Sequence, residues 1–553
     1  MKSIPLYCIL LFAGIFCAKG QNSSWSWARQ INGPSNEEEI DAVASDANGN
    51  VFISGKFEQT IDIEGVDSTL VSAGHADIMF TKYNSDGTMV WTKHFGSYGE
   101  DNVFDSKCDS EGNIILSGYF EGTVTFDTIT LTSWGKTDMM ILKFNPDGNI
   151  LWAKQMGGPD IDGGNEVSIG PHDRIVVAAE SNGNFSADSY TFSNTGWYDA
   201  YLISMTSDGN VEWVRAVQGA GRARAKAVAT DDAGNSFLGG DFVGQNAIAA
   251  PSGNFSFNHK GLRDAYVTSW TPNGDLRWYK YWGGDGNELC KGITTNSKLE
   301  VYLVGSIEET VDFEGQQLNS AGYDDLFIWK TDGLGNSLWI RQIASCENLS
   351  GSEVVTDPAG GVIGATSIIG EASFQTNGDD IVVQTGGTRQ WPALMQYNAD
   401  GSLNHVKLPD DCYAGRFREM SRTGNIIYLD VEYKGMIDFS GNIIETDDTV
   451  NRDAAILSLL LDDPAVSSWL KKKQIHRVRI YPNPTDDKVS ISFSEEMDAI
   501  TLHVYNGHGE LVQSRQIINT SEITHRLPGI SGIYFLQLVS SEGKSRFLKV
   551  SKE

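Results

Sequence analysis

The strongest constraint on the fold is a motif that ends in tryptophan and returns at spacings of 61 to 66 residues. Its most frequent form is Asp-Gly with the tryptophan four residues after the glycine, and a degenerate copy covers residues 400–405. A Gly-Asn-led strand, as in residues 49–55 and 112–118, and an aspartate that opens an apolar strand return in the same order. A period of this length predicts a repeat architecture. The tryptophans of the motif are Trp91, Trp152, Trp213, Trp278 and Trp339.

Each repeat of about 62 residues holds four short runs of β-type sequence separated by Gly, Asn and Asp turns. This pattern predicts one four-stranded antiparallel sheet per repeat, and such sheets cover their faces by packing radially. The repeat occurs seven times, but the seventh copy lacks its tryptophan strand. Residues 27–33 resemble residues 152–158 with no preceding repeat. We therefore expect an all-β protein whose seven-bladed β-propeller, residues 21–463, is closed by an N-terminal strand in the last blade.

The two ends of the chain differ from the repeats. Residues 1–20 contain a lysine, a short apolar run and small residues before Gln21, which is typical of a secretory signal peptide. Residues 464–475 form a polar linker, and residues 476–553 contain short alternating strands that predict a small C-terminal β-sandwich. No later apolar run is long enough to predict a transmembrane segment. The C-terminal part also carries an ordered set of motifs, namely Tyr481, Pro482, Asn483 and Pro484, then Gly532 and Tyr534, then Lys549.

Two resemblances follow from these motifs. The repeats across residues 25–463 resemble the bacterial SBBP-type β-propeller repeat, and residues 476–553 resemble the type A C-terminal sorting domain of the type IX secretion system. The second resemblance implies a Gram-negative source, Sec export and recognition of the C-terminal domain by the type IX translocon. It also implies removal of that domain and a protein that is either released or anchored at the outer-membrane surface.

The charge balance and the cysteines restrict the classes of function. The formal net charge of −30 argues against nucleic acid as a partner, because phosphate contacts need clustered cations. The cysteines outside the first 20 residues are widely spaced, which excludes CxxC redox and zinc motifs. They are Cys108, Cys290, Cys346 and Cys412. Idle thiols are one interpretation, and a disulfide among the last three is the other.

Known catalytic signatures are absent from the sequence, so we expect no enzyme and no cofactor. The repeated aspartates and tryptophans favour structural roles, because a single active site needs residues that break the symmetry of the repeat. Turns such as residues 46–50 lack the ligand order of an EF-hand and are interpreted as hairpin turns, with calcium binding left open.

The longest connections in the predicted propeller join the second and third strands of each blade and share one face of the disc with the crossings between blades. They carry aromatic side chains, while the crossings carry acids in blades one to three and arginines in blades four and seven. We therefore predict a binding face with an acidic arc opposite a basic arc. Its candidate ligand-binding residues are Trp134, Trp197, Tyr198, Tyr323, Arg222, Arg224, Arg416 and Arg418.

The sequence favours a secreted or cell-surface binding or adhesion protein with an extracellular glycan or protein as its ligand. One alternative is a secreted enzyme that degrades a glycan or another polymer with acidic residues at the channel rim, which requires two carboxyl groups in one cleft. The other alternative is a structural surface scaffold, which predicts no pocket.

Overall fold

The structure is a computed structural model that describes residues 24–34, 38–66, 69–347, 349–378, 380–385, 389–446, 452–461, 479–481, 488–506, 511–527, 531–540 and 545–552. The chain forms two compact units, Met1–Asp463 and Pro464–Glu553, called here the body and the tail. Apart from one 3-10 turn, Pro171–Asp173, the elements in these residues are strands. None of the described helical segments has the length and apolar character needed to cross a membrane. The predicted signal peptide and linker lie outside the described residues.

The body is built from sets of four antiparallel strands: three sets form separate sheets, two are extended to six strands by a hairpin, and the first and last sets are joined in one nine-stranded sheet. Their strands, in chain order, are β2 (Glu39–Ser45), β3 (Val51–Ile63), β4 (Leu70–Tyr83) and β5 (Met89–Phe95); β6 (Asn102–Cys108), β7 (Ile114–Phe126), β8 (Ile129–Phe144) and β9 (Ile150–Met156); β10 (Asp162–Gly170), β11 (Arg174–Ser181), β14 (Asp199–Met205) and β15 (Val211–Gly219); β16 (Arg222–Thr230), β17 (Ser236–Val243), β20 (Asp264–Trp270) and β21 (Leu276–Trp282); β22 (Leu289–Thr295), β23 (Val301–Ile307), β26 (Asp325–Thr331) and β27 (Ser337–Ala344); β28 (Ser350–Thr356), β29 (Val362–Ile369), β32 (Gln390–Tyr397) and β33 (Leu403–Lys407); and β34 (Asp411–Thr423), β35 (Ile426–Phe439), β37 (Asp453–Leu460) and β1 (Ser24–Asn32).

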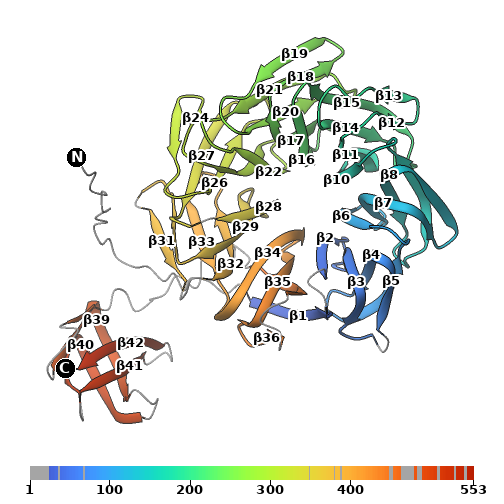
Figure 1. The fold of residues 1–553 in the computed structure, drawn as a ribbon. Helices are drawn as coiled ribbons and strands as arrows, with labels where there is room; N and C mark the ends of the chain where they lie inside the picture. The colour runs from blue at the N-terminus through green and yellow to red at the C-terminus, as the bar shows by residue number, and fades with distance from the viewer. Residues whose placement is uncertain are drawn as a thin grey trace, which may run out of the picture. The chain divides into compact units, whose positions relative to one another are not determined.

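The sheets follow one another around a common centre, with the first strand of each repeat innermost (Figure 1). Neighbouring innermost strands contact each other, and β34 of the last sheet contacts β2 of the first. The outer strand of the last sheet is β1, which pairs antiparallel with β37 from Ser24–Leu460 to Ile31–Ala454. This is the pairing that the sequence predicts for the N-terminal segment.

The tryptophan motif packs each sheet against the next. The indole Nε1–H of each motif tryptophan donates to a backbone carbonyl in the following sheet at 2.9 to 3.4 Å. The glycine of the following turn lies at positive φ, and its missing Cβ leaves room for the indole ring. The predicted structural role of the tryptophans is therefore confirmed. The donor and acceptor pairs are Trp27–Ser85, Trp91–Pro146, Trp152–Ser207, Trp213–Pro272, Trp278–Gly333 and Trp339–Ala399.

The connections predicted to be recognition loops are largely strands in which buried side chains alternate with more exposed ones, which corrects their assignment as loops. They form the hairpins β12–β13 (Phe185–Ala187, Tyr190–Phe192), β18–β19 (Gln245–Ala250, Gly253–Asn258), β24–β25 (Thr310–Phe313, Gln316–Asn319) and β30–β31 (Glu371–Phe374, Ile381–Gln384), and β36 (Asn442–Glu445) pairs with β35. β18 adds to the outer strand β15 of the preceding sheet, and β30 adds to β27. These hairpins cover outer edges that would otherwise be open to pairing with another chain.

The repeated aspartates and the calcium-like turns are structural. A carboxylate oxygen of Asp77, Asp138, Asp264 and Asp325 accepts the backbone N–H four residues earlier, at 2.6 to 3.1 Å. In the turn at Asp46, the side chain accepts the N–H groups of Asn48 and Asn50, and Gly49 lies at φ +81°. The hairpin interpretation of these turns is confirmed. Cys108, Cys290, Cys346 and Cys412 are all free, so the disulfide alternative is wrong.

The tail contains β38 (Arg479–Tyr481), β39 (Lys488–Tyr505), β40 (Leu511–Arg526), β41 (Gly532–Ser540) and β42 (Ser545–Lys552). Its described strands join in one five-stranded antiparallel sheet, whereas the predicted sandwich has two. The reason is that β39 and β40 are long and stay paired on both sides of a register shift between Ser492 and Met497. Of the motif residues, Gly532 opens β41, Tyr534 is buried in the core, Lys549 pairs with Phe535, and Tyr481 ends β38. Pro482, Asn483 and Pro484 lie outside the described residues.

Candidate functional site

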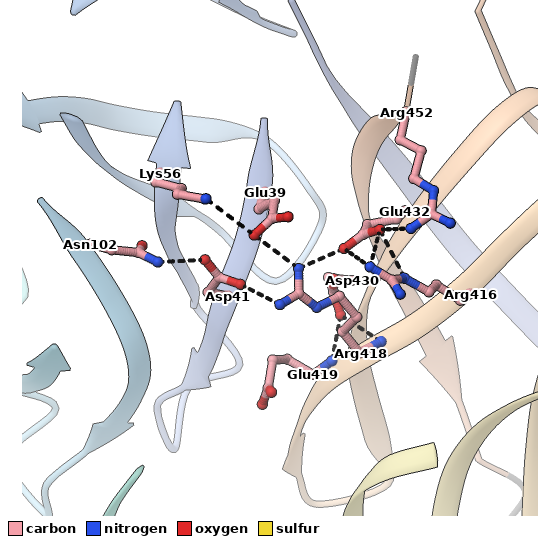
Figure 2. Close-up of polar contacts among 10 residues, drawn as sticks. All are labelled: Glu39, Asp41, Lys56, Asn102, Arg416, Arg418, Glu419, Asp430, Glu432 and Arg452. Atoms are coloured by element: carbon pink, nitrogen blue, oxygen red, sulfur yellow. Dashed lines mark hydrogen bonds and ion pairs between the residues drawn. The ribbon is translucent and has the colours of Figure 1, made fainter. Parts of the chain in front are cut away.

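A cluster of charged side chains joins the innermost strands of the first and last sheets of the body (Figure 2). At its centre is Arg418 on β34, whose guanidinium lies 2.7 Å from Asp41 Oδ1 and 3.2 Å from Glu39 Oε2, both on β2. The same guanidinium lies 2.6 Å from Glu432 Oε1 on β35. Residues separated by almost the whole repeat region therefore share one arginine. We call Glu39, Asp41, Arg418 and Glu432 the Arg418 cluster.

Glu432 is buried among three arginines. Its carboxylate lies 2.8 Å from Arg416 Nη2 and 3.0 Å from Arg452 Nη1, in addition to its contact with Arg418. Burial favours the neutral carboxyl, but Arg418 and Arg416 outweigh it and hold the pKa of Glu432 below its usual value. Glu432 thus remains an anion that positions the guanidinium groups around it.

Asp430 lies two residues away on β35 and behaves in the opposite way. It is fully buried, and burial raises the pKa of Asp430 to about 8, although its Oδ1 accepts the backbone N–H of Glu419 at 2.5 Å. Its Oδ2 has no partner among the described residues. A carboxyl group that no solvent reaches cannot meet a substrate, so Asp430 is a structural acid in this geometry.

A pocket of about 370 Å³ opens beside Glu432, between the last two sheets. Four cationic side chains, Arg389, Arg416, Lys434 and Arg452, line it together with that one carboxylate. The guanidinium carbon of Arg389 lies 3.7 Å from the centroid of the Tyr413 ring, which is a cation–π contact. Gly435 also lies against that ring, because a Cβ added at Gly435 would lie 2.9 Å from it. We call this cavity the basic pocket.

The predicted aromatic residues are not gathered into one site. Trp134, Trp197 and Tyr323 are strongly exposed, at 59%, 76% and 70%, but they belong to three different repeats and none of them lines the basic pocket. Tyr198, by contrast, is half-buried, because Arg224 covers its ring at a distance of 5.6 Å from the centroid. The Trp197 N–H donates to the Gly221 carbonyl, which fixes the loop that carries this side chain.

The predicted separation of acidic and basic arcs is wrong. Arg222 lies 3.1 Å from Asp241, and Arg224 lies 2.6 Å from Glu180 of the neighbouring sheet. Arg418 binds acids of the first sheet directly, as described above. The acids that pair with Arg222 and Arg224 were not among those of the predicted acidic arc, because strand pairing and sheet order, which bring them together, are not visible in charge counts.

Sequence reasoning also missed a group of carboxyl groups in the interior of the body. Glu166, Glu353 and Glu419 come from different sheets; Glu353 interacts with the other two, and all three interact with Asp105 and with the cation Lys107. Lys107 Nζ lies 2.7 Å from Asp105 Oδ1. Burial, with the repulsion from the neighbouring carboxylates, raises the pKa of Glu166 and Glu419, and burial raises the pKa of Glu353 to about 8. A shared inward position in the first strand of each repeat is the signal that points to this group.

No set of three or more metal-ligating side chains comes together in the residues that the structure describes. The sequence comparisons address the tail. Residues 479–551 match the family model of the secretion system C-terminal sorting domain. The tail is a type IX sorting domain. The sorting domain marks this protein as secreted or displayed at the cell surface, with a β-propeller-like body.

The body is only distantly similar to curated proteins. Over 251 residues the chain is 21% identical to an uncharacterized WD repeat-containing protein of Acanthamoeba polyphaga mimivirus, covering 38% of this chain and 17% of that protein. Over 168 residues it is 23% identical to the regulatory protein FlaEY of Caulobacter vibrioides, covering 30% and 18%. The chain spans less than a fifth of the length of these relatives.

Solved structures give equally remote similarities. A chain of the mitotic checkpoint complex has a TM-score of 0.40 and 9% identity, with 84% of this chain and 99% of that chain covered. A puromycin hydrolase has a TM-score of 0.40 and 10% identity, with 83% and 60% covered. Similarity at this level says nothing about ligands or activity.

Proposed function

We propose that this protein is a non-enzymatic binding protein that holds an anionic extracellular glycan in the basic pocket. In this proposal the body is a closed seven-bladed propeller of SBBP type, needs no cofactor, and leaves a Gram-negative cell through a Sec signal peptide and the type IX translocon. The contact between β34 and β2 and the pairing of β1 with β37 support the closed ring.

The observation that carries the ligand class is the composition of the basic pocket. Four cations and one carboxylate line it, in a chain whose net charge is −30. Such a concentration of positive charge in an acidic protein attracts an anion, and guanidinium groups bind carboxylates or sulfates through paired hydrogen bonds. Glu432 already pairs with Arg416, Arg418 and Arg452, whereas Arg389 lies against the Tyr413 ring, so Arg389 is the cation that we expect a ligand to meet first.

The glycan-degrading alternative has less support. It needs two carboxyl groups facing a cleft that a polymer can enter, one of them with a raised pKa. Asp430, two residues from Glu432 of the basic pocket, has a raised pKa but is fully buried. A scaffold without a ligand is the other alternative, and it gives no reason for a cationic pocket.

The test measures binding of the full chain to polygalacturonate, chondroitin sulfate and neutral dextran by affinity electrophoresis and calorimetry at low salt. We expect retention by an anionic polymer, at least about tenfold weaker binding in the double variant Arg389→Ala/Lys434→Ala, and a decrease as salt is raised. Lys136→Ala is the matched control, because Lys136 is an exposed cation outside the pocket. No retention by either anionic polymer, or equal binding by the double variant, would refute the proposed ligand.

A further inference from the structure

The repeats expose a side chain at one shared position, two residues before the repeated aspartate of the third strand. In the sixth repeat Trp391 takes the place of the aspartate, because Trp391 pairs with Ile368 as Asp325 pairs with Ile307 one repeat earlier. We call this place the display position. Because the sheets follow one another around a common centre (Figure 1), the display positions follow one another at the same end of the sheets. In the first six repeats they hold His75, Lys136, Trp197, Leu262, Tyr323 and Arg389, all exposed.

The backbone of the display position is held in place while its side chain stays accessible. The N–H of Trp197 donates to the Gly221 carbonyl at 2.9 Å, and the N–H of Leu262 donates to the Gly286 carbonyl at 3.0 Å. The side chains of Trp197, Leu262 and Tyr323 are nevertheless 76%, 61% and 70% exposed. A side chain on a fixed backbone loses little freedom when it binds, so these positions are preorganised for a ligand.

The chemistry of the display position differs from that of the chain as a whole. Acidic residues outnumber basic ones by 72 to 42 in the sequence, yet none of the six displayed side chains is acidic. The third to fifth repeats display Trp197, Leu262 and Tyr323, and the sixth displays Arg389. Apolar side chains that are exposed singly need no explanation, but these three occupy one position in consecutive repeats. The order points to a ligand that has both apolar faces and negative charge.

This row of side chains leads into the basic pocket. Arg389, at its end, lines the pocket. On the other side of the same repeat, the glycine before Tyr323 lies against Ser345, since a Cβ added there would be 2.5 Å from the Ser345 carbonyl oxygen. Ser345 Oγ donates to the carbonyl of Glu371 at 2.8 Å, and Glu371 stands two residues after Ile369, which also lines the pocket. A short series of contacts thus connects Tyr323 with the basic pocket.

A hydrocarbon surface fits this row less well than a glycan. Asp324 directly follows Tyr323 and is half-buried. The exposed Asp285 lies beside the loop of Leu262, because a Cβ added at Gly261 would be 2.4 Å from the carbonyl carbon of Asp285. Burying these carboxylates in lipid is unfavourable. Sugar hydroxyls, by contrast, donate to carboxylates while sugar C–H groups cover the exposed rings.

We infer that Trp197, Leu262, Tyr323 and Arg389 form a binding track for an extended anionic polysaccharide. The inference rests on the proposed function, because one acidic sugar occupies the basic pocket through Arg389. The sugars that follow it along the polymer cover the ring of Tyr323 and then reach Leu262 and Trp197. Each contact on the track is weak alone, but contacts made by one polymer reinforce one another. The ligand is therefore a chain of several sugars, of which the basic pocket holds only one.

The test is calorimetry on the full chain at low salt, with galacturonate and chondroitin sulfate oligosaccharides as di- and dodecasaccharides. In the series that binds, we expect the dodecasaccharide to bind at least about tenfold more tightly than the disaccharide. Tyr323→Ala and Trp197→Ala should each weaken binding of the dodecasaccharide by at least about threefold and leave the disaccharide unchanged. Arg389→Ala should weaken both. Since a longer chain also offers more ways to bind, the aromatic variants decide the question.

Leu334→Ala is the matched control. Leu334 is 71% exposed and belongs to the same repeat as Tyr323, but it lies between β26 and β27, at the opposite end of β26. Its substitution should leave the affinity for both oligosaccharides unchanged.

The outcomes separate this inference from the proposed function. If no oligosaccharide binds, the proposed ligand of the basic pocket is refuted, and the track with it. The track alone is overturned if disaccharide binding depends on Arg389 but the dodecasaccharide binds no more tightly, or if Tyr323→Ala leaves dodecasaccharide binding unchanged. Sedimentation of the full chain with phosphatidylcholine vesicles, abolished in Tyr323→Ala, would also overturn it, because the row would then be a lipid-binding surface.

Discussion

The Trp27 indole N–H donates to the carbonyl oxygen of Ser85 at 3.0 Å, joining the N-terminal strand of the body to the first complete repeat. Trp27 belongs to β1, which is hydrogen-bonded to the last strand of the repeat region. The bond repeats the one from Trp213 to Pro272 in the middle of the chain. The N-terminal strand β1 thus supplies the outer strand of the last sheet of the repeat region.

Replacing Trp27 tests whether this junction stabilises the body. Trp27 is 6% exposed, and removing a buried tryptophan ring costs about 3–5 kcal/mol. We expect Trp27→Ala to lower the free energy of unfolding by that amount in urea denaturation. Trp134→Ala, which removes a ring that is 59% exposed, is expected to change it by less than about 1 kcal/mol. Equal effects of the two substitutions would contradict an essential N-terminal strand.

The glycine beneath Trp27 provides an independent test. Gly87 lies at φ +80°, and an added Cβ would lie 2.6 Å from the Trp27 ring. Gly315 lies at φ +95° with nothing within 4 Å of an added Cβ. Alanine at either position carries a backbone cost of about 1–2 kcal/mol, but only Gly87→Ala also displaces an aromatic ring. In thermal and urea unfolding, the free energy of unfolding of Gly87→Ala should therefore be at least about 1 kcal/mol lower than that of Gly315→Ala. The reverse order would exclude close packing at this junction.

Asp430 gives the body a pH dependence whose sign is determined. The pKa of Asp430 is about 8 in the folded chain because the group is buried, against about 3.9 for an unfolded aspartate. The folded state therefore keeps a proton that the unfolded state releases, and the stability that this proton contributes is full below pH 4 and is lost as the pH rises to 8.

Asp430→Asn removes that titration. The free energy of unfolding of the variant minus that of the unaltered chain should increase by at least about 2 kcal/mol as the pH rises from 5 to 8. Urea denaturation at each pH measures this difference. The exposed Asp147→Asn serves as the control. Parallel pH profiles for the Asp430 variant and the unaltered chain would show that this carboxyl ionises normally.

The tail should be necessary for export. Deleting residues 479–551 removes the matched sorting domain, so we expect the truncated protein to remain inside the outer membrane while the full chain reaches the surface or the medium. Cell fractionation with immunoblotting measures this, and a reporter protein fused to residues 464–553 tests sufficiency. Export of the truncated chain at the normal level would show that another segment directs secretion.

Much of the body could be predicted from local patterns. The position of Trp213 beside Gly274 follows from two motifs that return with the same period, and Asp138 caps its own loop four residues earlier. The pairing of residues 27–31 with β37 followed from similarity to residues 152–158. The hairpin strands were missed, although the alternation in Val311-Asp312-Phe313, repeated in Ile437-Asp438-Phe439, is the signal for them.

The candidate sites were less predictable because they depend on contacts between distant segments. The sequence alone determined the repeat, the turns and the strand order, since those follow from periodic side chains and short-range hydrogen bonds. Only the tertiary structure decided that Arg418 binds Asp41, 377 positions away, and that the hairpin β24–β25 does not pair with β21. Charged groups and aromatic rings form a binding site only when packing places them opposite a particular neighbour, and a local sequence pattern does not identify that neighbour.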